Sequence, residues 1–246
     1  MRLAALLGEE RNRLDGIASE KGREFAIGPD NLCEEIPQII KFTTEYHRLF
    51  SQYLEAVLPQ QPRAIQCRPA CGNCCHHYPM SVEPFELISL YSDLRKHCDL
   101  LELMESCLSR SSMFEKFYES RKGEHLSVSP SEADIDDMAE DLALHDYFSA
   151  WKPCPFSDQA GDCTVYPLRP VSCRMYFSET DPKYCTPEYL QTPENDSYIV
   201  YLPDCIEDAV YGISEHYSLL ELPESFFGGL LAVNAYEGLL SGETQK

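Results

Sequence analysis

The sequence predicts a mainly α-helical protein with small β content and two irregular segments that are rich in cysteine. Two observations lead to this fold class. Four stretches keep apolar residues at helical spacing, whereas only one short stretch has the character of a strand. Most of the 12 cysteines lie outside those four stretches, in segments with little periodicity.

The first 29 residues are polar and end in AIGPD, so we expect residues 1–29 to form a loosely packed lead-in. We expect residues 30–246 to form a single α-rich domain that contains a cysteine-cluster core at about 67–176. The first helix of this domain begins at a capping box formed by Asn31 and Glu34, and Pro59 ends it.

The remaining elements follow from periodicity and from helix start signals. A second helix has Ser81 as its cap and Pro84 in its first turn. Its apolar stripe consists of Leu87, Ile88, Tyr91, Leu94, Cys98, Leu101 and Leu108. We expect a third helix over Glu132–Ala150, with Met138 on its apolar side, a short strand over Ser197–Leu202, and a last helix within residues 223–240.

Charge and hydropathy restrict the compartment and the partners. The formal net charge is -21, and so acidic a surface repels nucleic-acid phosphates and anionic lipid. The apolar run Leu3–Leu7 is too short for the core of a signal peptide. The run Phe226–Tyr236 is far shorter than the ~20 residues of a spanning helix. We therefore expect a cytoplasmic protein with no nucleic-acid or membrane partner, and a protein partner is left open.

The first cysteine segment reads CRPACGNCCHH and begins at Cys67. Its spacing, Cys67-x3-Cys71-x2-Cys74-Cys75, allows several thiolates to converge on one ion without a long chain closure. Gly72 suits the tight turn that this convergence needs. Neighbouring side chains diverge in an extended backbone, so Cys74 and Cys75 would point apart, and one of them would serve a second metal or simply pack.

The second cysteine segment contains Cys154, Cys163 and Cys173. The Gly161-Asp162 pair predicts a hairpin-like loop that brings Cys154 and Cys163 together. Arg169 and Arg174 flank Cys173. Their guanidinium groups would offset the negative charge of a four-thiolate centre, or else they form ordinary surface ion pairs.

Four interpretations compete for these cysteines. A disulfide framework does not suit a reducing compartment, and a redox pair of Cys71 and Cys74 lacks a surrounding βαβ pattern. Radical enzymes that cleave S-adenosylmethionine share the Cys-x3-Cys-x2-Cys spacing, but Asn73 stands where they have an aromatic residue, and their barrel pattern is missing. A metal site explains all seven clustered thiols. We interpret the outlying Cys33, Cys98 and Cys107 as structural thiols.

The motif CRPACGNCC, followed by CPF, VYPLRP and CR, resembles the YkgJ-type cysteine-cluster family, the CxxCxxCC proteins described as zinc- or iron-chelating. The resemblance spans about Cys67–Tyr176, and the first gap is three residues where many members have two. It implies metal ligation by Cys67, Cys71, Cys74, Cys75, Cys154, Cys163 and Cys173. His76, His77 and Cys185 are reserve ligands. Similar motifs occur in flagellin lysine N-methylases, where an iron–sulfur cluster is implicated.

The sequence thus predicts a metal-binding protein that coordinates zinc or an iron–sulfur centre, and that brings its two cysteine segments together in space. Thiolate ligands do not distinguish zinc from iron, because both accept tetrahedral sulfur. One alternative is an iron–sulfur-dependent group-transfer enzyme that resembles protein lysine methylases. Another is a noncatalytic interaction protein in which zinc only staples the fold. No residue of the sequence stands out as a general base or nucleophile.

Overall fold

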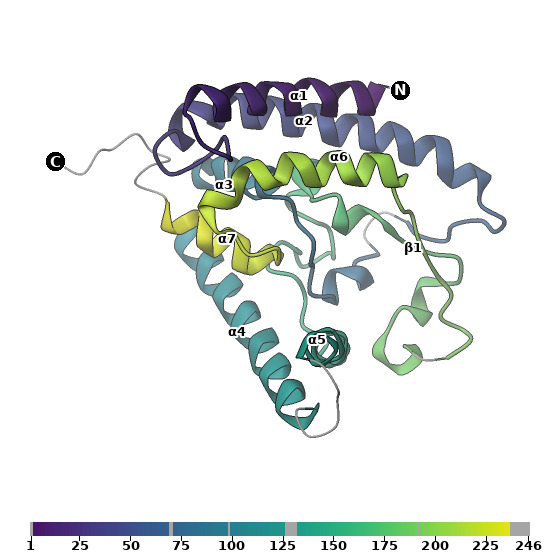
Figure 1. Ribbon diagram of the computed structural model, residues 1–246. Helices are drawn as coiled ribbons and strands as arrows, with labels where there is room; N and C mark the ends of the chain where they lie inside the picture. The colour runs from purple at the N-terminus through teal and green to yellow at the C-terminus, as the bar shows by residue number, and fades with distance from the viewer. Residues whose placement is uncertain (1, 69–70, 98, 126–131, 191, 237–246) are drawn as a thin grey trace.

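The computed structural model describes residues 2–68, 71–97, 99–125, 132–190 and 192–236. Helices dominate this part of the chain, and its strands form one two-stranded sheet, so the predicted fold class is confirmed. Figure 1 shows α1 and α2 along one side of the molecule, the long α4 on another, and the irregular cysteine-rich segments beside them.

The N-terminal segment is a packed helix, α1 (Arg2–Glu20), which lies against α2 (Leu32–Val57) and α6 (Asp204–Ser214) (Figure 1). The side chains of Leu7 and Leu14 are fully buried. Arg13 of α1 contacts Glu35 of α2 at 2.5 Å. The expectation of a loosely packed lead-in over residues 1–29 is therefore wrong, because a narrow apolar stripe in α1 finds partners from distant parts of the chain.

Helix α2 begins at Leu32, close to the predicted start, but not through the predicted capping box. The side chain of Asn31 accepts the backbone N–H of Gly28 at 2.9 Å and donates to the carbonyl of Ala26 at 3.0 Å. It makes no capping hydrogen bond to the helix. Asn31 thus holds the turn that precedes α2.

The predicted second helix is two helices, α3 (Pro84–His97) and α4 (Leu100–His125). The first half of the predicted apolar stripe, from Leu87 to Leu94, is buried. Leu101 and Leu108 of α4 are 71% and 55% exposed, so the stripe does not continue through α4 as predicted. Cys98 lies outside the described residues.

The remaining helices complete the core. Helix α5 (Glu132–Ser149) agrees with the prediction and packs on α4, although Met138 is 46% exposed. Helix α7 (Phe226–Ala235) packs on both α3 and α4. Around Phe85 of α3, the rings of Phe42 and Tyr46 of α2 lie edge-on at 5.0 and 5.4 Å. Helix α3 is thereby fixed between α2 and α7.

The sheet consists of β1 (Tyr176–Ser178) and β2 (Ser197–Ile199), which pair antiparallel with Phe177 opposite Tyr198. The strand predicted at Ser197–Leu202 is confirmed over its first half. Strand β1 directly follows the second cysteine segment, so the sheet stands next to the thiols. Within the described residues, every helix is too short or too polar to cross a membrane.

Candidate metal centre

The first cysteine segment is a tight turn around a short 3-10 helix, Asn73–His76. Gly72 precedes it with a φ of 67°, in the left-handed region that favours glycine. A β-carbon on Gly72 would lie 3.1 Å from the carbonyl oxygen of Gly161, in the second segment. Gly72 therefore allows both the turn and the close approach of the two backbones.

The second segment has the predicted hairpin-like form. Ser157 and Cys163 face each other in an antiparallel bridge. Thr164 donates its backbone N–H to the carbonyl of Phe156 at 2.8 Å. This loop places Cys154 and Cys163 on its two opposite arms. A 3-10 turn, Tyr166–Leu168, follows, and a second one, Ser172–Arg174, contains Cys173.

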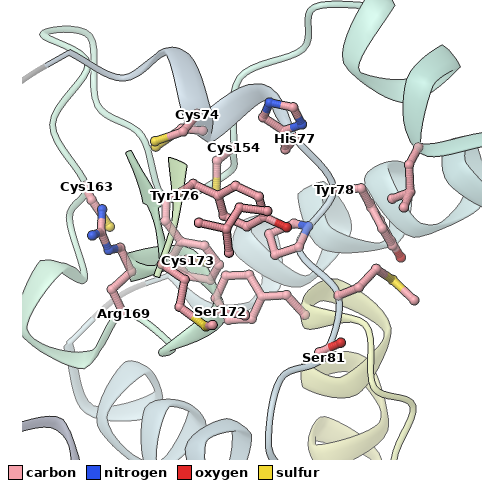
Figure 2. Close-up of a pocket in the computed structure, with 18 of the residues that line it drawn as sticks. Cys74, His77, Tyr78, Ser81, Cys154, Cys163, Arg169, Ser172, Cys173 and Tyr176 are labelled. Atoms are coloured by element: carbon pink, nitrogen blue, oxygen red, sulfur yellow. The ribbon is translucent and has the colours of Figure 1, made fainter. Parts of the chain in front are cut away.

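The two segments meet in space, as predicted. The backbone N–H of Cys154 donates to the carbonyl of Cys75 at 2.8 Å. A cavity of about 310 Å³ opens at this junction, and thiols from both segments lie on its wall. These are the thiols of Cys74, Cys75, Cys154, Cys163 and Cys173. Figure 2 shows Cys74, Cys154 and Cys163 with Arg169 on one side of the cavity, and Tyr78 on the other.

Cys67 and Cys71 lie outside the wall of this cavity. The thiol of Cys67 accepts the backbone N–H of Ser178, in β1, at 3.1 Å. The backbone N–H of Cys71 donates to the Arg68 carbonyl at 3.2 Å. The first segment thus reaches from β1 to the cavity.

The premise behind the prediction that Cys74 and Cys75 diverge is wrong. That prediction assumed an extended backbone, whereas both residues lie in the 3-10 turn. The neighbouring Cys75 thiol, followed by burial, raises the pKa of the Cys74 thiol.

The two histidines that follow the cysteines are packed between aromatic rings. His76 stacks on Trp151 with the centroids 3.8 Å apart, and His77 stacks on Phe148 at 3.9 Å. Burial lowers the pKa of His77 to about 4, so this ring is neutral at physiological pH. The stacks join the first segment to the end of α5 and the residues that follow it.

A buried carboxylate that the sequence analysis missed holds the second segment in place. Glu86 of α3 is 1% exposed. Its Oε1 accepts Nε2–H of His47, in α2, at 2.6 Å and the backbone N–H of Val171 at 2.9 Å. Val171 is two residues before Cys173, so the position of that thiol is tied to the helical core. The sequence did contain one signal for this role, because Glu86 lies among the apolar residues of its helix.

The two predicted arginines have different positions. Arg174 is buried, and its guanidinium donates to three backbone carbonyls, those of Tyr166, Pro167 and Arg169. It therefore braces the loop before Cys173, and its charge also acts to lower the pKa of the Cys163 thiol. Arg169 lines the cavity, and its Nε is buried without a hydrogen-bond partner among the described residues.

Three thiols on the cavity wall, those of Cys154, Cys163 and Cys173, favour the protonated form while no metal is bound. Burial raises the pKa of Cys173 to about 12 and also raises that of Cys154 and Cys163. The guanidinium of Arg169 acts in the opposite direction on Cys163 and Cys173. A metal that binds these thiols must displace their protons, so its affinity should increase with pH.

The donor set fits a thiophilic metal in chemistry and in backbone placement. As the side chains stand, no three Cys, His, Asp or Glu residues in the described part of the chain could hold one ion together. Rotation about χ1 moves a cysteine sulfur by about 3 Å between staggered positions without any backbone movement. Soft thiolates are the ligands that zinc and iron centres accept.

The other cysteines divide differently from the prediction. Cys107 is fully buried in α4, as expected for a structural thiol. Cys33 is exposed, so the prediction that it packs as a small hydrophobe is wrong. Cys205, which the sequence analysis did not consider, is exposed in the first turn of α6.

In a comparison with known proteins, the sequence matches the model of one family. The model of a family described as "CxxCxxCC: Putative zinc- or iron-chelating domain" matches residues 66–195. The match covers more than half of the 246 residues and contains both cysteine segments. Neither the curated proteins nor the solved structures provide a match.

Proposed function

The chain belongs to this family of zinc- or iron-chelating domains, and on that premise we propose that its clustered cysteines hold the metal. The ligands come from both segments: Cys67, Cys71, Cys74, Cys75, Cys154, Cys163 and Cys173. The observation that supports this most is the backbone hydrogen bond between Cys75 and Cys154, because it joins two segments that are far apart in the sequence.

The metal, when bound, supplies cross-links between the two cysteine segments. Each segment is irregular, with only short 3-10 turns. Thiolate ligation couples metal binding to folding, so the bound metal should stabilise the packing around the cavity. Arg169 would offset part of the negative charge of the thiolates, since it lines the cavity and its buried Nε has no hydrogen-bond partner in the described part of the chain.

The metal is zinc or the iron of an iron–sulfur centre, and the chain acts in the cytoplasm. A reducing compartment keeps thiols available as ligands. The net charge of -21 disfavours nucleic acid as a partner. Colour distinguishes the metals: protein purified without oxygen should be brown if it holds an iron–sulfur centre and colourless if it holds zinc.

Serine substitution at one ligand from each segment tests the proposal. Cys71→Ser and Cys173→Ser should each lower the metal content and the melting temperature, because each removes a thiolate. Cys33→Ser is the matched control, since Cys33 is exposed on α2. If the control loses as much metal as the other two, or if all three keep their metal, the proposed ligand set is wrong.

A second candidate function, group transfer at an iron–sulfur centre, is favoured by the cavity. Five thiols share its wall with apolar residues and with Arg169, so a small substrate could lie beside the metal. S-adenosylmethionine, added without oxygen, should then perturb the visible spectrum of the metal centre. An unchanged spectrum at saturating concentrations would leave the chain as a metal-binding protein without this activity.

A further inference from the structure

Cys185 lies next to the first cysteine segment, although it follows the second one in the sequence. It comes directly after the 3-10 turn Pro182–Tyr184. The carbonyl of Pro182 accepts both the backbone N–H of Cys185, at 2.9 Å, and the side-chain amide of Asn73, at 2.6 Å. One carbonyl therefore holds Cys185 beside the turn that carries Cys71 and Cys74.

Ser178 joins Cys185 to the beginning of the first segment. Its backbone N–H donates to the sulfur of Cys67 at 3.1 Å, and its side chain lies close enough to the thiol of Cys185 to act on the pKa of that thiol, in the direction that lowers it. The backbone N–H of Gln66 donates to the Ser178 carbonyl at 2.8 Å and fixes the chain at this point. Cys67 and Cys185 thus lie at the same end of β1, where burial raises the pKa of the Cys67 thiol and the thiol of Cys185 adds to that effect.

The eight thiols separate into two groups with the Cys74–Cys75 pair between them. One group, at β1 and the first turn, contains Cys67, Cys71 and Cys185. The other group, on the wall of the cavity, contains Cys154, Cys163 and Cys173. The paired residues lie in one 3-10 turn, and both line the cavity.

We infer that this chain holds two metal ions, and that Cys185 is a ligand of the first. Each ion is a divalent, thiophilic one, zinc or ferrous iron, and each takes three thiolates from its own group and one from the Cys74–Cys75 pair. Seven thiolates leave one of two tetrahedral sites incomplete, whereas eight complete both. This inference rests on the proposed function, because it assigns further ligands to the same metal-binding cysteines.

The metal-to-protein ratio of the full chain tests this directly. The protein is stripped of metal, loaded anaerobically with Zn²⁺, freed of excess ion, and analysed by mass spectrometry for zinc. Wild-type protein and the exposed control Cys205→Ser should retain about two ions per chain. Cys185→Ser and Cys154→Ser should each retain about one, because each removes a ligand of a different site.

A second variant distinguishes lost ligation from misfolding. Cys185→His should restore about two ions, since an imidazole can replace a thiolate on zinc. Wild-type protein that holds one ion, with Cys185→Ser also holding one, would overturn the two-site inference and leave the proposed function intact. A single four-iron cluster in the native protein would overturn it as well. Wild-type protein that holds no metal would overturn both proposals.

Discussion

Replacing Glu86 by alanine should destabilise the chain and loosen the second cysteine segment. The Glu86 carboxylate is buried in α3, and its Oε1 accepts hydrogen bonds from His47 at 2.6 Å and from Val171 at 2.9 Å. In Glu86→Ala both donors lose this acceptor inside the protein. The same change frees the backbone two residues before Cys173.

The expected cost follows from these two donors. A buried donor without a partner costs about 1–3 kcal/mol. Two of them amount to about 4 kcal/mol, which for a chain of this size corresponds to a fall in melting temperature of roughly 8–16 °C. Glu86→Gln should cost less, because its amide oxygen can still accept the N–H of Val171.

Urea unfolding of the metal-free chain measures this stability, and a competition titration with a chromophoric zinc chelator measures metal affinity. Glu86→Ala should lower both, and Glu55→Ala, at an exposed glutamate of α2, should change neither. A loss of stability below about 1 kcal/mol in Glu86→Ala would refute the reasoning, because the two buried donors would then have found other partners.

Two further predictions concern Glu83 and Arg174. Burial raises the pKa of Glu83 from 4.5 to about 7, so the protonated form stabilises the fold at low pH and this contribution is lost as the pH rises through about 7. The free energy of unfolding of Glu83→Gln, relative to that of the wild type, should therefore increase by about 2 kcal/mol from about pH 5 to about pH 8. Urea denaturation at the two pH values measures this, and the same difference between variant and wild type at both would contradict the prediction. Arg174→Lys should lower the free energy of unfolding by about 3 kcal/mol, because an ammonium group cannot reach the three carbonyls that the guanidinium contacts. Urea denaturation measures this free energy, and an unchanged value in Arg174→Lys would contradict the prediction.

Local patterns predicted the elements that sequence periodicity can reveal. Helices α2 and α5 have bounds close to the prediction, because the apolar residues that indicate each helix lie within the element itself. Helix α1 was not predicted, because its few apolar residues are buried only by contact with α2 and α6, which are distant in the sequence. No proline or glycine stands between the end of α3 and the start of α4, so the sequence contains no signal that separates the two helices.

The sequence predicted which thiols lie together, but it did not predict the contacts that hold them in position. Cysteine spacing indicated that the two segments would meet, and they do at Cys75 and Cys154. The contacts of Glu86 with Val171 and of Asn73 with Pro182 join residues 85 and 109 positions apart. A single sequence contains no signal for such pairings, because each partner taken alone resembles an ordinary polar residue.

X-ray absorption at the metal edge of the purified protein tests the central claim most directly. The account predicts a first coordination shell made of sulfur, at about 2.3 Å for zinc, because thiolates from the two cysteine segments supply the ligands. A shell dominated by nitrogen or oxygen at about 2.0–2.2 Å would contradict it, since the metal would then be bound elsewhere than at the clustered cysteines.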